Sequence, residues 1–518
     1  MRAERLFSIL GLVDPELVDE ALDSNAAIRR RHAAVWRRYA AAAACCVIVC
    51  GALYWSVRFL SMGGGSDTAA SESTAADTTD GADSGTAGGT GEDNAAQAPA
   101  DSYMSYAGPV LPLTTLETDT GLTAERTLTL DFAPGAHADG TSGQWGAQVT
   151  DRYVLTNPTE ADVSVTALYP VTGSLADLSV LAPQLTVDGT AAAYEVYAGG
   201  YAGTFGDEND HNGSTHNLAG PYSWEDYAAL VSDSDYLAGA LAGTPDLSTP
   251  VTVYDFSDVT LTGEAEQPEL VVSCTFDPEA TTILSYDFSS SNWDDSGAWR
   301  QYGERIDLNR WGTPTLIVLG ADIDYTLLAD YGMDAPDLTG ADCAVVRWET
   351  TLGEALTALC RTELAEQKAA SGVSLELYVK AAAELLTVYG PLSDAPMDRY
   401  ADGRLDDLLS EALTMDRILY LAVPVTVPAG GSAEVTASFW KRPSYDFGGS
   451  GTGREGLQGF EVLTTAGSSL TFTGQTAAVT HTEGVEIAGE DFGLDSDGTA
   501  LLDLAAPRYG LELRPIGN

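Results

Sequence analysis

The chain has 518 residues, of which 44% are hydrophobic and 8% aromatic, enough apolar material for more than one folded core. It carries 25 basic and 76 acidic residues, a formal net charge of −51. The first 60 residues hold eight arginines and six acidic residues, which leaves 17 basic and 70 acidic residues in the rest of the chain. A surface of this charge repels nucleic acid, so we expect no nucleic-acid partner.

An uncharged stretch of 19 residues runs from Tyr39 to Val57. As an α-helix it would span roughly 28 Å, close to the hydrocarbon thickness of a bilayer. Five arginines (Arg29, Arg30, Arg31, Arg37 and Arg38) precede it, whereas Arg58 alone follows before an acidic segment. This asymmetry predicts a single transmembrane helix at 39–57 in the cell membrane, with residues 1–38 in the cytoplasm and the C-terminal part extracellular. A cleaved signal peptide, with its cleavage site near residues 61–63, is the main alternative.

The segments on the two sides of this stretch differ in composition. On the cytoplasmic side, Asp14, Pro15 and Glu16 form a typical helix start, and Leu17, Val18 and Leu22 follow on one face. This helix either lies against the membrane or binds a cytoplasmic partner through those three side chains. On the other side, residues 61–102 are almost wholly Gly, Ser, Thr, Ala and acidic residues, a composition that predicts a disordered acidic stalk.

From residue 103 onward, period-two alternation between apolar and polar residues predicts β-strands. Leu128, Leu130 and Phe132 alternate with polar residues, and the runs 149–156 and 162–169 around Asn157-Pro158-Thr159-Glu160 predict a hairpin. Further strands are predicted at 269–276, 282–288 and 313–319, and a helix at 224–241. We therefore expect a β-rich ectodomain over 103–345.

Helical spacing replaces this alternation in the next part of the chain. The runs 352–359, 375–388 and 405–413 predict a helical insert over 346–417. Strands are then predicted at 418–427 and 433–440, around the turn Pro428 to Gly431, and near 462, 470–472, 485–487, 501–504 and 511–513. The expected class is α+β, mainly β, with β-sandwich-like modules and a C-terminal β-rich region over 418–518.

Several stretches of the chain are similar to known proteins. VTDRYVLTNPT (149–159), VPAGGSAEV (427–435), GFEVLTTAGSSLTFTGQTA (459–477) and EDFGLD (490–495) resemble ectodomains of uncharacterised Gram-positive membrane proteins. The front end, residues 4–22 with the arginine cluster and the Ala/Cys-rich stretch, resembles clostridial-type single-pass proteins, some of which are similar to anti-sigma factors. The resemblance implies an envelope location and a signalling role, and it supplies no catalytic residues.

Motifs that sometimes carry chemistry favour structural interpretations here. Gly451 to Gly456 matches G-x-G-x-x-G but is surrounded by Gly and Ser, which indicates a loop. His211 and His216 lie among carboxylates in a spacing that does not fit a calcium loop, and Asp495 to Gly498 reads first as a turn. We predict no cofactor, no metal and no catalytic residue. The sequence also allows one disulfide among Cys274, Cys343 and Cys360.

The most suggestive cluster for a ligand is aromatic. It comprises Trp293, Trp299, Tyr302 and Trp311, interspersed with Asp294, Asp295 and Arg300. Planar rings beside carboxylates suit a sugar or peptide ligand, although such residues also serve as core and rim packing. We expect a non-enzymatic, membrane-anchored protein that binds an envelope or extracellular ligand or has a structural role at the surface. The alternatives are an anti-sigma-like transmembrane regulator and a cell-wall hydrolase.

Overall fold

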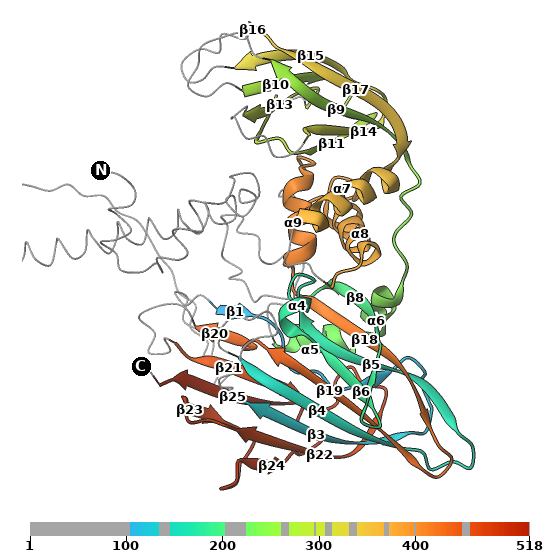
Figure 1. The fold of residues 1–518 in the computed structure, drawn as a ribbon, viewed down its shortest axis with the longest axis vertical. Helices are drawn as coiled ribbons and strands as arrows, with labels where there is room; N and C mark the ends of the chain where they lie inside the picture. Colours follow the sequence, from blue (N-terminus) through green and yellow to red (C-terminus); the bar gives the residue numbers. More distant parts are fainter. Residues whose placement is uncertain are drawn as a thin grey trace, which may run out of the picture. The chain divides into compact units, whose positions relative to one another are not determined.

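The computed structural model describes residues 104–133, 146–202, 224–260, 269–294, 297–305, 313–330, 339–366, 372–397, 400–447 and 456–516. These residues are mainly β, as expected, with a smaller helical portion (Figure 1). In these ranges no helix is long and apolar enough to cross a bilayer. The predicted cytoplasmic segment, transmembrane helix and stalk lie outside the described residues, as do Leu17, Val18 and Leu22.

Three sheets form what we call the first sandwich. Its seven-stranded sheet runs in the order β24 (Thr499–Leu501), β22 (Thr471–Thr480), β3 (Thr123–Asp131), β4 (Ala147–Thr156), β19 (Ser432–Lys441), β6 (Gln184–Val187) and β7 (Thr190–Ala192). A four-stranded sheet contains β2 (Thr114–Thr115), β5 (Val163–Gly173), β18 (Arg417–Val427) and β8 (Glu195–Tyr201). A five-stranded sheet contains β1 (Met104–Tyr106), β20 (Tyr445–Phe447), β21 (Gln458–Leu463), β25 (Arg508–Pro515) and β23 (Val485–Glu490).

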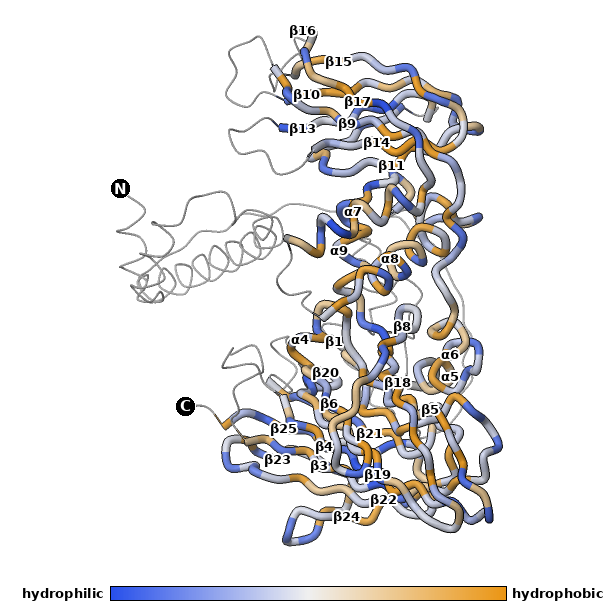
Figure 2. Tube along the Cα trace, turned by 45° about the vertical axis from the view of Figure 1, so that its right-hand side comes forward, coloured by the Kyte–Doolittle hydropathy of each residue, from blue (hydrophilic) through white to orange (hydrophobic). Residues whose placement is uncertain are grey.

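The alternation that predicted these strands also builds the core between the sheets. Along β4, buried residues alternate strictly with more exposed ones, so this strand presents one buried face. Tyr153 of β4 meets Tyr169 of β5 edge-on, with ring centroids 6.3 Å apart, and Phe132 meets Phe460 of β21 at 5.1 Å. Hydrophobic residues recur along the strands in Figure 2. The seven-stranded sheet thus packs on both smaller sheets.

The predicted hairpin at 149–169 is wrong in its pairing, although both strands exist. β4 pairs with β3 and β19, whereas β5 pairs with β2 and β18, so the intervening turn crosses from one sheet to the other. The turn between β18 and β19 crosses in the same way. Asn157 is fully buried between the two turns and donates through Nδ2 to the carbonyl oxygens of Val427 and Pro428, at 3.1 Å each. This asparagine joins two stacked arches and does not close a hairpin.

Two further sheets form the second sandwich. One has the order β11 (Thr281–Tyr286), β14 (Thr315–Gly320), β9 (Pro250–Thr260) and β17 (Asp342–Thr351). The other has the order β12 (Ser290–Trp293), β13 (Trp299–Arg305), β10 (Glu269–Thr275), β15 (Asp324–Asp330) and β16 (Thr339–Gly340). Tyr254 and Phe256 of β9 contact Tyr325 of β15, with ring centroids 5.5 and 6.0 Å apart. These rings mark the inner faces of both sheets.

The helices form two groups. Near the first sandwich lie α4 (Leu178–Leu181), α5 (Trp224–Ser232) and α6 (Ser234–Leu241); the predicted helix 224–241 breaks where Asp233 adopts an extended conformation and caps α6. The second group contains α7 (Leu352–Glu366), α8 (Leu375–Glu384), the π-helical turn Leu385–Tyr389 and α9 (Leu405–Thr414). It lies within the predicted insert, whose first residues belong instead to β17. Tyr286 of β11 donates to Glu363 of α7 at 2.5 Å, which ties this group to the second sandwich.

Candidate functional site at the edge of the second sandwich

The strand register separates the aromatic residues that the sequence grouped together. β12 pairs with β13 so that Trp293 lies opposite Arg300, and side chains directly opposite in an antiparallel pair share a face. Tyr302, two residues beyond Arg300, is on that same face. Trp299, one residue before Arg300, is on the other face, where its Nε1 donates to Ser273 Oγ at 3.1 Å. Trp311 lies outside the described residues.

Burial separates the remaining two residues. Tyr302 is fully buried in the second sandwich, and its ring contacts Phe288 with centroids 5.5 Å apart. Trp293 keeps 55% of its surface exposed at the last position of β12, an edge strand of its sheet. Tyr302 is therefore a core residue, and Trp293 is the most exposed of the cluster's described members.

Arg300, opposite Trp293, is held in place by two contacts. Its guanidinium carbon lies 5.9 Å from the ring centroid of Phe276, and its Nη1 donates to the backbone oxygen of Asp402 at 3.1 Å. Its Nε and the Tyr302 hydroxyl are both buried and have no hydrogen-bond partner of good geometry among the described residues. Burial raises the pKa of Tyr302 to about 12, so its hydroxyl keeps its proton at neutral pH. We call Trp293, Arg300, Phe276 and the Asp402 carbonyl the Trp293 edge.

The Asp402 carbonyl is held by the turn before α9. Gly403 has φ +76°, and a Cβ at this position would collide with the backbone oxygen of Ile283 in β11. The close approach lets the Ser285 amide donate to the Gly403 oxygen at 2.9 Å. The turn is thereby fixed against β11, and so is the acceptor that orients Arg300.

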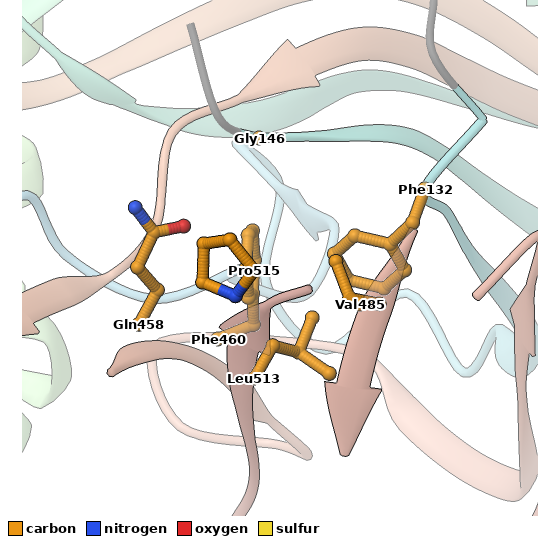
Figure 3. A pocket seen from close by; sticks show the side chains of 7 residues that line it. All are labelled: Phe132, Gly146, Gln458, Phe460, Val485, Leu513 and Pro515. Atoms are coloured by element: carbon orange, nitrogen blue, oxygen red, sulfur yellow. The ribbon is translucent and has the colours of Figure 1, made fainter. Parts of the chain in front are cut away.

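Two openings elsewhere offer less to a ligand. Phe132, Phe460, Val485, Leu513 and Pro515 gather at one end of the first sandwich (Figure 3), around gaps too narrow for a water molecule. An open depression of about 400 Å³ lies between the segment before β9 and helices α7 and α8, lined by Thr244, Thr357, Leu375, Glu376 and Val379. The first is a packing defect. The second is open to solvent and offers one carboxylate among apolar and hydroxyl groups.

Two buried charged groups in the first sandwich escaped the sequence analysis. Arg126 donates through Nε and Nη2 to the two carboxylate oxygens of Asp151, at 2.9 and 2.7 Å, and both side chains are fully buried. Lys441 is also buried, and its Nζ donates to the Arg442 oxygen at 3.1 Å. Burial, reinforced by the charge of Arg442, lowers the pKa of Lys441 to about 7. The sequence did contain a signal for the burial of Arg126. It alternates with period two with Ala124, Leu128 and Leu130, so it lies on the same buried face of β3.

A carboxylate at the start of α9 is also perturbed. The Asp287 amide, at the end of β11, donates to both carboxylate oxygens of Asp406 at 3.0 Å. Burial, together with the charge of Asp287, raises the pKa of Asp406 to about 7. This contact joins α9 to the second sandwich beside the Trp293 edge.

The other motifs acquire structural roles or fall outside the described residues. The Asp495 carboxylate accepts hydrogen bonds from the amides of Asp497 and Thr499 and from the Thr499 hydroxyl, as a tight turn requires. Within the described ranges, no three or more His, Cys, Asp or Glu side chains are placed to hold a metal. Cys274, Cys343 and Cys360 form no disulfide with one another. His211, His216 and residues 451–455 of the glycine motif lie outside the described residues.

Comparison with known proteins adds no homologue from which residue roles could be transferred. No family model matches the chain, and no curated protein matches it in sequence. The candidate site therefore rests on its own geometry.

Proposed function

We propose that this chain is a single-pass membrane protein whose extracellular part binds a ligand of the cell envelope or the extracellular space at the Trp293 edge. The observation that carries this proposal is the exposure of Trp293 beside an oriented arginine. Exposed tryptophans that contact a fixed polar group are typical of binding surfaces, because one side chain supplies a large apolar area at little entropic cost. The sequence of residues 39–57 and its flanking arginines support the anchored topology.

The surrounding contacts support binding over simple packing. A tryptophan that serves the core is covered by its neighbours, as Tyr302 is on the same face of the sheet. Trp293 is instead held at a strand end with more than half its surface in water, and the guanidinium opposite it is fixed by a ring and a carbonyl. Such preorganisation lowers the entropy lost on binding.

A sedimentation assay with the full chain in proteoliposomes tests the proposal. Purified insoluble cell envelope is mixed with the proteoliposomes, and bound protein is quantified for wild type, Trp293→Ala and Trp348→Ala. Trp348 is the matched control, because this second exposed tryptophan lies on β17 of the other sheet, 38% exposed, and donates to Asp255 at 2.8 Å. We expect Trp293→Ala to weaken binding about tenfold or more and Trp348→Ala to change it less than about twofold. Equal binding by all three proteins would refute the proposal.

The topology is tested separately in intact cells. Protease added outside should digest the part of the chain beyond residue 60 and leave a short membrane-protected N-terminal fragment. A chain that stays intact under these conditions, but is digested after lysis, would place the Trp293 edge inside the cell and contradict an extracellular ligand.

A further inference from the structure

We infer that the Trp293 edge recognises a neutral saccharide, with the indole stacked on the apolar face of a sugar ring and Arg300 donating to a sugar oxygen. The inference rests on the proposed function and narrows its ligand class. Three features of the edge carry it: the donors that Arg300 has left, the length of strand β12 and the charge of the surroundings.

The first feature is the way the guanidinium is used. Arginine recognises carboxylates and phosphates best when two adjacent nitrogens form a fork. In Arg300, Nη1 donates to the Asp402 oxygen and Nε is buried, so both forks are blocked. The remaining nitrogen, Nη2, has no hydrogen-bond partner among the described residues. The N–H groups of this one nitrogen suit a hydroxyl, a ring oxygen or an acetamido oxygen, which are the acceptors of a sugar.

The second feature argues against an extended peptide. A peptide that adds to a sheet edge gains affinity from a row of main-chain hydrogen bonds. β12 contains four residues, Ser290–Trp293, and alternate residues point their backbone groups toward β13, so few outward groups remain. A ring that stacks on the indole needs no such row, since it uses the exposed face of one side chain.

The third feature is charge. Beyond residue 60 the chain carries 17 basic against 70 acidic residues, and Asp294 directly follows Trp293. The electrostatic field of this negative charge repels a polyanionic glycan at long range, whereas a neutral glycan experiences no such repulsion.

Two buried polar atoms add an independent observation. The Nε of Arg300 and the hydroxyl of Tyr302 lie on one face of β13 and lack hydrogen-bond partners of good geometry within the described residues. The two side chains interact with each other without good hydrogen-bond geometry, and apolar residues of similar size would avoid the cost of burying these atoms. A ligand that accepts a hydrogen bond from Nη2 would account for an arginine at this position, opposite Trp293 in the strand pairing.

The test is calorimetric titration of the full chain in lipid nanodiscs with three probes: chitohexaose, cellohexaose and hexagalacturonate. We expect at least one neutral probe to bind wild type, with affinity that changes less than about twofold between low and high salt. Trp293→Ala and Arg300→Met should each weaken this binding about tenfold, and Trp348→Ala less than about twofold. Thermal unfolding of each variant checks that the sandwich is intact.

The outcomes separate this inference from the proposed function. If envelope binding depends on Trp293 but neither neutral probe binds, or hexagalacturonate binds more tightly than both, the ligand class is wrong and the binding function stands. A peptide released from the envelope that competes at Trp293 would likewise replace the saccharide. If neither the envelope nor any probe responds to Trp293→Ala, both proposals fall together.

Discussion

Each sandwich places an arginine against an aromatic ring, but Arg126 is fully buried and Arg300 half-buried, and their hydrogen-bonding groups are satisfied to different degrees. Arg126 in the first sandwich forms a fork with Asp151, donates to the Leu463 oxygen at 2.6 Å and lies over the Tyr153 ring at 5.6 Å. Arg300 in the second sandwich has one carbonyl partner, and its Nε has none within the described residues.

The difference distinguishes a structural network from a binding edge. The Asp151 carboxylate also accepts from the hydroxyls of Tyr153 and Tyr169 at 2.7 and 3.0 Å, so the network around Arg126 is closed. A closed buried network fixes how the sheets meet and has nothing left for a ligand. Incomplete satisfaction at a solvent edge is therefore the more informative sign of function.

The largest expected loss of stability follows from removing the carboxylate at the centre of the Arg126 network. Asp151→Ala leaves the Arg126 charge buried and removes the acceptor of two tyrosine hydroxyls. We expect a loss of about 3–5 kcal/mol in the free energy of unfolding, measured by urea denaturation. The control is Arg152→Ala in the same strand, which removes a largely exposed ion pair with Glu434 and should cost less than about 1 kcal/mol. Equal losses in the two variants would show that the buried network does not stabilise the first sandwich.

Lys441 provides a second test of the comparison, because it is a buried amine whose Nζ donates to the Arg442 oxygen. The unfolded chain takes up a proton at Lys441 near pH 10.5, whereas the folded chain keeps the amine neutral down to about pH 7. Stability should therefore fall as the pH falls from about 10.5 to 7, and change little from this group below that. Lys441→Met removes this penalty, and we expect a gain of roughly 2–4 kcal/mol at pH 7.

The pH dependence of that gain is the control. Urea denaturation of wild type and Lys441→Met should give a larger difference at pH 7 than at pH 10, because most of the preference of the unfolded chain for the protonated amine develops between these two pH values. A variant that is destabilised by the same amount at both pH values would show that the contacts of Lys441, including its bond to the Arg442 oxygen, outweigh its desolvation.

A smaller effect is expected at Asp406, which is half-buried. Its folded pKa of about 7 lies above the unfolded value of 3.8, so its contribution to stability is complete below about pH 4 and is lost as the pH rises through 7. Asp406→Asn keeps an acceptor for the Asp287 amide and removes the titration. Thermal unfolding between pH 4 and 8 should therefore show a flatter profile for the variant than for wild type, and parallel profiles would contradict the raised pKa.

The sequence predicted the strands better than their partners. Alternation identified β4 and β19 almost to the residue, because period two reports one buried face whatever the strand pairs with. The predicted strand 418–427 likewise matches β18, although its first seven residues are all buried. Because this pattern is local and does not identify strand partners, the turn at Asn157 between two consecutive strands was predicted as a hairpin. Its role as a link between two arches depends on Val427 and Pro428, about 270 residues away, and no local pattern encodes that contact.

For the candidate site, part of the missing information was present in the sequence. Trp299 and Tyr302 are three residues apart, so in a strand they must face opposite sides, which the grouping of aromatics overlooked. The pairing of Trp293 with Arg300 and the support from Asp402 depend on register and on a turn about 100 residues further along the chain. Those contacts are tertiary and required the structure.

The smallest expected change in stability is at Arg300, and it decides whether the comparison holds. Arg300→Met loses one hydrogen bond to the Asp402 oxygen but also removes the buried Nε that lacks a partner, and a methionine can still pack on Phe276. These effects oppose each other, so we expect urea denaturation to give a change within about 1 kcal/mol. A loss near that of Asp151→Ala would mean that Arg300 is as structural as Arg126, and the argument from its incomplete satisfaction would no longer favour a ligand. A small change in stability together with a large loss of binding is the combination that a packing role alone does not produce.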